Sequence, residues 1–187
     1  SRGLGDVYKR QGCVWWGWGI IGLGAIGKRV AKIAQAFGAR VIYYSTSGKN
    51  LNTDYAQVGF EELLEKSDVI SIHASLNEKT KGLINYDALP KMKKNSIIIN
   101  VGRGPIIVEY DLVRAIDEEI IGGAAIDVFD IEPIPKQSPL LGVRNNERLV
   151  MTPHVAWASE EARKRLFDDL LENISAFNRG ELRNRVD

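Results

Sequence analysis

The fold of this chain is decided by the stretch GIIGLGAIG at residues 19–27, which continues as KRVAKIAQAFG at residues 28–38. The first part predicts a short buried strand and a tight turn, and the second predicts an amphipathic helix that stops at a glycine. The spacing Gly22-x-Gly24-x-x-Gly27 in this context is the pattern of a dinucleotide-binding turn. The first glycine makes the turn, the second leaves the backbone open to a pyrophosphate, and the third lets helix and strand pack closely. The N-terminus of the helix then faces the phosphates.

Strands and helices alternate along the rest of the chain. Apolar and β-branched runs predict further strands at residues 40–44, 68–73, 96–101, 123–128 and 148–152, and the run at 96–101 is typical of a strand buried on both faces. Helices are predicted at 60–66, from Asn85 towards Met92, over residues 111–119, and at 159–179. This alternation predicts an α/β fold, a Rossmann-type doubly wound parallel sheet.

The last predicted helix, at residues 159–179, carries one apolar stripe. Its members recur at helical spacing, which predicts a buried face; they are Ala162, Leu166, Leu170, Ile174 and Phe177.

Composition excludes several classes of protein. The 187 residues contain 25 Lys plus Arg and 24 Asp plus Glu, so no strong field favours nucleic acid or an acidic membrane. No apolar run reaches the length of a membrane span. A single cysteine, Cys13, excludes an internal disulfide and fits a reducing cytoplasm. No metal site is predicted. Residues 1–11, SRGLGDVYKRQ, have no strand or helix pattern and are interpreted as a non-native leader.

In a parallel sheet, ligands lie beyond the carboxyl ends of the strands. Ser45 follows the second predicted strand, where an acid bonds the ribose hydroxyls when NAD is the cofactor. Ser45 is neutral and does not repel a 2′-phosphate, and Ser47 and Lys49 lie near enough to bind one. The alternative is that all three are ordinary loop residues. The choice between NAD and NADP therefore stays open.

Three reactive side chains follow three successive predicted strands: Arg103, Glu132 and His154. An arginine binds a substrate carboxylate in bidentate fashion. A histidine donates a proton to a ketone oxygen, and a glutamate beside it stabilises its charged form. Each residue alone is common, and the combination carries the hypothesis. The other histidine, His73, ends an earlier strand and is interpreted as a hydrogen-bonded core or adenine-side residue.

With these residues in view, the chain resembles the D-2-hydroxyacid dehydrogenase family from Trp18 to about Val186. The matching motifs are GLGAIG (22–27), SDVISIH (67–73), NEKT (77–80), INVGRG (99–104), AIDVF (125–129) with Glu132-Pro133, and TPH (152–154). The stretch HVAWAS at 154–159 is similar to the hydroxypyruvate reductase/glycerate dehydrogenase branch, in which a Trp follows the catalytic His.

The resemblance implies a catalytic trio of Arg103, Glu132 and His154 and a small 2-keto or D-2-hydroxy acid substrate, such as hydroxypyruvate or glyoxylate. It also implies a homodimer formed through the cofactor domains. Beside the three glycines of the turn, it implies cofactor contacts by Ala25, Ile26, Ser45, Ala74, Thr80, Val101, Gly102 and Asp127. Ser75, in place of the usual proline, and Ser45, in place of the usual acid, depart from the family pattern.

Family members carry about a hundred further residues before the glycine turn, which build most of a substrate domain. We therefore expect residues 12–154 to form the dinucleotide-binding domain and 155–187 to form a helix and tail that return to a substrate domain missing here. On this interpretation the chain is a fragment that is inactive alone. Two other functions stay open: phosphoglycerate dehydrogenase, and a non-catalytic NAD(H)-sensing corepressor of the same fold.

Overall fold

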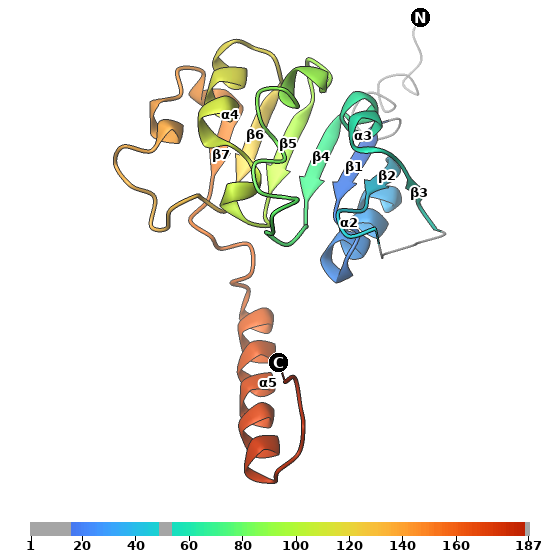
Figure 1. The fold of residues 1–187 in the computed structure, drawn as a ribbon, viewed down its shortest axis with the longest axis vertical. Helices are drawn as coiled ribbons and strands as arrows, with labels where there is room; N and C mark the ends of the chain where they lie inside the picture. The colour runs from blue at the N-terminus through green and yellow to red at the C-terminus, as the bar shows by residue number, and fades with distance from the viewer. Residues whose placement is uncertain (1–15, 49–53, 186–187) are drawn as a thin grey trace, which may run out of the picture. The chain divides into compact units, whose positions relative to one another are not determined.

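The computed structural model describes residues 16–48 and 54–185 (Figure 1). The predictions for the leader, Cys13 and Lys49 fall outside these residues. The chain divides into two compact units, Ser1–Pro153 and His154–Asp187, which are described separately.

The first unit is built on one seven-stranded sheet in the order β3-β2-β1-β4-β5-β6-β7, in which every neighbouring pair is parallel. The strands are β1 (Gly17–Ile21), β2 (Arg40–Tyr44), β3 (Ala56–Gln57), β4 (Val69–Ile72), β5 (Ile97–Asn100), β6 (Gly123–Ile126) and β7 (Leu149–Met151). This order confirms the predicted Rossmann-type fold.

Helices cover both faces of the sheet. On β1, Ile20 packs with Ala31 of α2 (Ala25–Ala36), whereas Ile21 belongs to a larger cluster on the opposite face. Side chains alternate between faces along a strand, so α2 lies on one side. The larger cluster also holds apolar residues of α3 (Phe60–Lys66), α4 (Glu109–Asp117) and the short 3-10 helix η1 (Leu89–Lys91). Further 3-10 helices are η2 (Gly104–Ile106), η3 (Pro139–Gly142) and η4 (Asn146–Arg148).

Two expectations for this unit are wrong in detail. Asn85 does cap a turn, because its Oδ1 accepts from the backbone N–H groups of Asp87 and Ala88, but only η1 follows instead of an α-helix. Pro90 lies within η1, and a proline disfavours continued α-helical hydrogen bonding. The strand at β5 is also not buried on both faces: Ile98 is inaccessible, whereas Ile97 is 36% exposed. The described helices leave that part of the second face open.

The second unit contains α5 (Glu160–Asn178), a 19-residue helix. Ser159 is its N-cap and accepts from the Ala162 backbone N–H at 3.2 Å, as helix starts require. The predicted buried stripe is wrong for four of its five residues, since no described residue covers them; the exposed members are Leu166, Leu170, Ile174 and Phe177.

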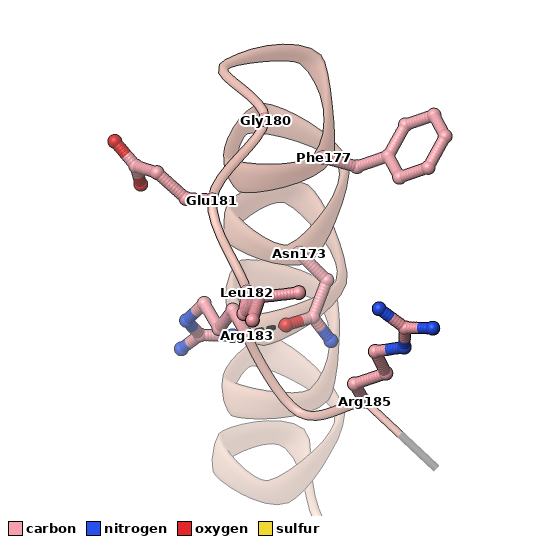
Figure 2. Close-up of a pocket in the computed structure, with 7 residues that line it drawn as sticks. All are labelled: Asn173, Phe177, Gly180, Glu181, Leu182, Arg183 and Arg185. Carbon is pink, nitrogen blue, oxygen red and sulfur yellow. Dashed lines mark hydrogen bonds between the residues drawn. The ribbon is translucent and has the colours of Figure 1, made fainter. Parts of the chain in front are cut away.

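The tail after α5 folds back along the helix and bounds a pocket (Figure 2). Arg183 of the tail holds this arrangement: its guanidinium bonds the side chains of Asp169, at 2.7 Å, and Asn173. The pocket is lined by Asn173, Phe177, Gly180, Glu181, Leu182, Arg183 and Arg185.

Candidate functional site

The central strand β1 pairs with β2 on one edge and with β4 on the other. The order of the strands therefore reverses at β1, and in an open parallel sheet the ligand crevice lies beyond the carboxyl ends of the strands at such a point. The glycine turn follows β1 directly at this position.

Two of the three glycines of the turn are required by the backbone around them. Gly22 has φ +90°, and a methyl group there would lie 2.8 Å from the backbone of Ala74. A methyl group on Gly27 would lie 2.3 Å from the carbonyl oxygen of Gly22, so only glycine permits this helix–strand approach. Gly24 differs, because a methyl group there would meet no atom within 4 Å. Its lack of a side chain leaves open space in front of the turn.

Helix α2 begins at this open space. Its N-cap is Gly24, which has no side chain to bond the first N–H groups, and its first turn carries no acidic residue. Ala25 and Ile26 are exposed there. Free N–H groups and a positive helix end suit a pyrophosphate, so the residues present fit a dinucleotide.

The ends of β1, β4 and β5 come together. Gly22 lies against Ala74, and a methyl group on Gly102 would be 3.2 Å from the Ala74 carbonyl oxygen. Val101 and Gly102 are half-buried. Thr80 is fully buried and closes the loop after β4: its Oγ1 donates to the Ser75 carbonyl at 2.8 Å and accepts from the Asn77 N–H at 2.8 Å.

Ser45 and Asp127 directly follow β2 and β6. The Ser45 hydroxyl accepts from the Gly48 N–H at 3.1 Å and so closes its own loop. Asp127 is buried, and its carboxylate accepts a short 2.5 Å hydrogen bond from the Thr152 hydroxyl after β7. Contact of these residues with a cofactor stays a prediction.

Arg103 and Glu132 lie on two loops that touch. A methyl group on Gly104 would lie 2.0 Å from the carbonyl carbon of Phe129, so the Arg103 loop runs directly against the loop after β6. Glycine at position 104 therefore serves the close approach of the two loops. On the second loop, the Glu132 carboxylate accepts from the Phe129 N–H at 3.0 Å. Arg103 and Glu132 are both exposed.

His154 is the first residue of the second unit, so its position relative to Arg103 and Glu132 stays a prediction. Its backbone has φ +53°, a left-handed conformation that is uncommon outside glycine. His154 is half-buried. Trp157, one turn further on, donates from its indole Nε1 to the His154 carbonyl oxygen at 2.8 Å.

His73 is not the hydrogen-bonded residue that was expected. Both ring nitrogens are buried, and among the described residues neither has a hydrogen-bond partner. Burial disfavours the charged imidazolium and lowers the pKa of His73 below its ordinary value.

Sequence reasoning assigned no role to Asn100 or Thr152. Asn100 is fully buried, and its side chain bonds the backbone of the Arg103 loop on both sides. The signal was present, because a polar residue ends the apolar run Ile97–Asn100. A polar residue in a buried strand needs partners, and here the partners are the loop that carries the arginine.

Two kinds of feature are absent from the part of the chain that the structure describes. No three His, Cys, Asp or Glu side chains are grouped so that they would hold a metal ion. No described helix combines the length and the apolar character needed to cross a membrane.

Comparison with known proteins agrees with this geometry. The hydroxypyruvate reductase of Blautia hydrogenotrophica is 42% identical over 172 residues, which cover 90% of this chain and 52% of that protein. The glyoxylate reductase of Korarchaeum cryptofilum is 41% identical over 182 residues, covering 95% and 52%. A solved acyclic imino acid reductase (Bsp5) in complex with NADPH and D-Arg superposes with TM-score 0.84 and 34% identity, covering 95% of this chain and 55% of that one.

The chain thus spans about half the length of the curated relatives it matches. Residues 15–156 match the family described as "D-isomer specific 2-hydroxyacid dehydrogenase, NAD binding domain". The match covers the sheet, the glycine turn and the Arg103 and Glu132 loops. The chain belongs to the D-isomer specific 2-hydroxyacid dehydrogenase family, of which it contains the NAD-binding domain.

Proposed function

We propose that the protein interconverts a small 2-keto acid and its D-2-hydroxy acid, with NADH or NADPH as the hydride donor. One observation supports this above the others: the glycine turn, Gly102 and Arg103 meet at one edge of the sheet, with Glu132 on the adjoining loop. This arrangement supports a dinucleotide site next to a side chain that is suited to bind a carboxylate.

A dinucleotide held at the turn of Gly22, Gly24 and Gly27 would supply the hydride for the carbonyl carbon. In the proposed site the Arg103 guanidinium binds the substrate carboxylate and orients the ketone. His154 donates a proton to the ketone oxygen, which would otherwise develop negative charge. Glu132 stabilises the charged imidazolium and fixes its orientation. In the reverse direction His154 accepts the hydroxyl proton.

Hydroxypyruvate and glyoxylate are the proposed substrates. The names of the two relatives, hydroxypyruvate reductase and glyoxylate reductase, support them. Both substrates are short 2-keto acids, and a single arginine suffices to bind their carboxylate.

Substitution of the catalytic residues in the full-length protein tests the proposal. His154→Ala is expected to lower kcat by a factor of about a hundred or more, the range for a lost general acid–base. Arg103→Ala is expected mainly to raise KM for the keto acid while NADH binding stays unchanged. Retained turnover in His154→Ala would contradict the role of the histidine. Loss of NADH binding alone in Arg103→Ala would show that the arginine serves the cofactor.

The resemblance also supports a homodimer formed through the dinucleotide-binding domains, and the single cysteine supports a reducing cytoplasm. A small-molecule keto acid is the proposed partner, with no nucleic acid or membrane involved. Light scattering of the purified full-length protein tests the dimer, which a mass of one chain would contradict.

A further inference from the structure

The side chain of Asn100 is inaccessible to solvent at the end of β5, three residues before Arg103. Its Nδ2 donates to the Arg103 carbonyl oxygen at 3.0 Å, and its Oδ1 accepts from the Gly102 N–H at 3.0 Å. The first partner only accepts and the second only donates. Just one orientation of the amide satisfies both, so the side chain is held in a defined position.

The Arg103 side chain completes a ring of hydrogen bonds. Its Nη1 donates to the Gly102 carbonyl oxygen at 2.8 Å. Asn100 therefore donates to Arg103, Arg103 donates to Gly102, and Gly102 donates back to Asn100. The Asn100 amide takes part in two of these bonds and is the group that joins them. The ring connects the position of a guanidinium at the surface to a fully buried amide.

Little else holds the Arg103 carbonyl. It also accepts from the Ile106 N–H, but at 3.3 Å, longer than the bond from Asn100. The next residue, Gly104, lies against the backbone of Phe129, and this contact fixes the part of the loop that follows Arg103. The buried amide is therefore the shortest attachment of the arginine's own peptide to the sheet.

We infer that Asn100 is a positioning residue for Arg103, which it holds in the orientation that binds the substrate carboxylate. This inference rests on the proposed function. Because the Asn100 side chain is fully buried, its proposed effect on substrate binding runs through the loop. A misplacement of about 1 Å in a binding group is enough to slow an enzyme a hundredfold.

Two variants of similar size separate the two halves of the amide. Asn100→Asp keeps an oxygen that accepts from the Gly102 N–H. The ionised carboxylate has no hydrogen to donate, so the bond to the Arg103 carbonyl oxygen is lost. Asn100→Leu keeps the volume and loses both bonds. In the full-length protein, Asn100→Asp is expected to lower kcat/KM for glyoxylate at least about tenfold, mainly through KM, with the Kd for NADH changed less than about threefold. Asn100→Leu is expected to lower kcat/KM at least as far.

A double-mutant cycle with Arg103→Ala distinguishes positioning from general damage. If Asn100 acts through the arginine, Asn100→Asp in the Arg103→Ala background lowers kcat/KM by less than about twofold. Asn145→Asp is the matched control. The Asn145 Nδ2 donates to the Ile116 carbonyl oxygen at 3.3 Å, and the residue precedes β7, at the opposite end of the strands. This control is expected to lower stability and leave KM for glyoxylate unchanged.

The possible outcomes separate the inference from the proposed function. If the wild-type protein reduces glyoxylate with neither NADH nor NADPH, the proposed function fails. If Arg103→Ala keeps full kcat/KM, the reaction stands but the arginine does not bind the carboxylate, and the positioning role is wrong with it. If Arg103→Ala loses it but Asn100→Asp does not, or if Asn100→Asp costs the same factor in both backgrounds, the function stands and the positioning role is wrong. A tenfold loss that disappears in the Arg103→Ala background supports it.

Discussion

The indole N–H of Trp157 donates a 2.8 Å hydrogen bond to the backbone carbonyl oxygen of His154, whose own φ is +53°. A non-glycine residue in this left-handed conformation costs about 1–3 kcal/mol and persists only where its surroundings hold it. The backbone bond from the Ala158 N–H to the Val155 carbonyl, at 2.9 Å, tightens the same turn. The conformation of the proposed catalytic histidine is therefore tied to a tryptophan side chain.

Trp157→Phe removes this donor and keeps an aromatic ring. Because one neutral hydrogen bond contributes about 0.5–1.5 kcal/mol, we expect kcat of the full-length protein to fall about threefold to tenfold. The chain has only two histidines, so ¹⁵N-histidine NMR should show His154 signals that shift while those of His73 stay fixed. Trp18→Phe is the control, since it loses an indole bond to the Ser71 hydroxyl in the sheet. Unchanged His154 signals would contradict the link.

One role of Glu132 is observed and a second is proposed. Its carboxylate accepts from the Phe129 N–H, and in the proposed site its negative charge supports the His154 imidazolium. Glu132→Gln keeps an oxygen acceptor but removes the charge, so we expect kcat to fall about tenfold to a hundredfold with little loss of stability. Glu132→Ala should lower both kcat and the free energy of unfolding. Equal kcat in Glu132→Gln and the wild type would contradict the role of the charge and leave Glu132 only its bond within the loop.

The neutral side chain at Ser45 makes cofactor choice testable. A carboxylate at this position bonds the ribose hydroxyls of NADH and repels the 2′-phosphate of NADPH. Ser45→Asp is therefore expected to raise the ratio of the Kd for NADPH to that for NADH at least about tenfold, which is about 1.4 kcal/mol. Fluorescence titration of this chain with both dinucleotides measures it, and Ser175→Asp, at an exposed position of α5, serves as the control. An unchanged ratio would place the ribose away from Ser45.

The burial of His73 predicts that the protein loses stability at acid pH. Burial lowers its pKa in the folded chain below the ordinary value of 6.5, so just below that pH the unfolded chain binds more protons than the folded one. Stability is then complete above the unfolded pKa and falls as the pH drops from it towards the folded pKa, by at most about 1.4 kcal/mol per pH unit. Urea unfolding from about pH 7.5 to about pH 5 should show a steeper loss in the wild type than in His73→Gln. Parallel profiles would contradict the assignment.

Much of the fold could be predicted because its determinants are local. The glycine turn, the apolar strand runs and the stop signals of the helices all act within a few residues, and the strand order follows from the doubly wound pattern. The short strand β3 was missed because Ala56–Gln57 has only two residues and no apolar pattern. The periodicity of α5 alone predicts a buried stripe, whereas the resemblance, in which this helix returns to a further domain, predicts exposed apolar surface in this chain. The stripe is exposed, because an apolar periodicity predicts what a helix is suited to contact and not whether the contact is present.

The candidate site was predictable at the level of residue types. Arg103 and Glu132 were placed correctly at the ends of strands, because parallel strands bring their carboxyl ends to one edge. The contacts that hold these two loops were not predictable. Gly104 lies against the backbone of Phe129, and the Asn100 side chain bonds the backbone of Gly102. Both contacts involve backbone atoms, which leave no pattern in the sequence. The absence of partners for His73 also depends on surroundings that its neighbours in sequence do not specify.

The central place of β1 has a consequence for synthesis of the chain on the ribosome. Gly17 at the start of β1 finds its hydrogen-bond partner Asp68, just before β4, 51 residues later. At a synthesis rate of about 5–20 residues per second, one edge of this largely apolar strand stays unpaired for about 3–10 s before its neighbour has been made. An open strand edge is a template for pairing with other chains. Ribosome-arrested chains that stop before Val69 should therefore retain more chaperone than chains that extend beyond Asn100, and the nascent protein is most vulnerable to misassembly in that interval.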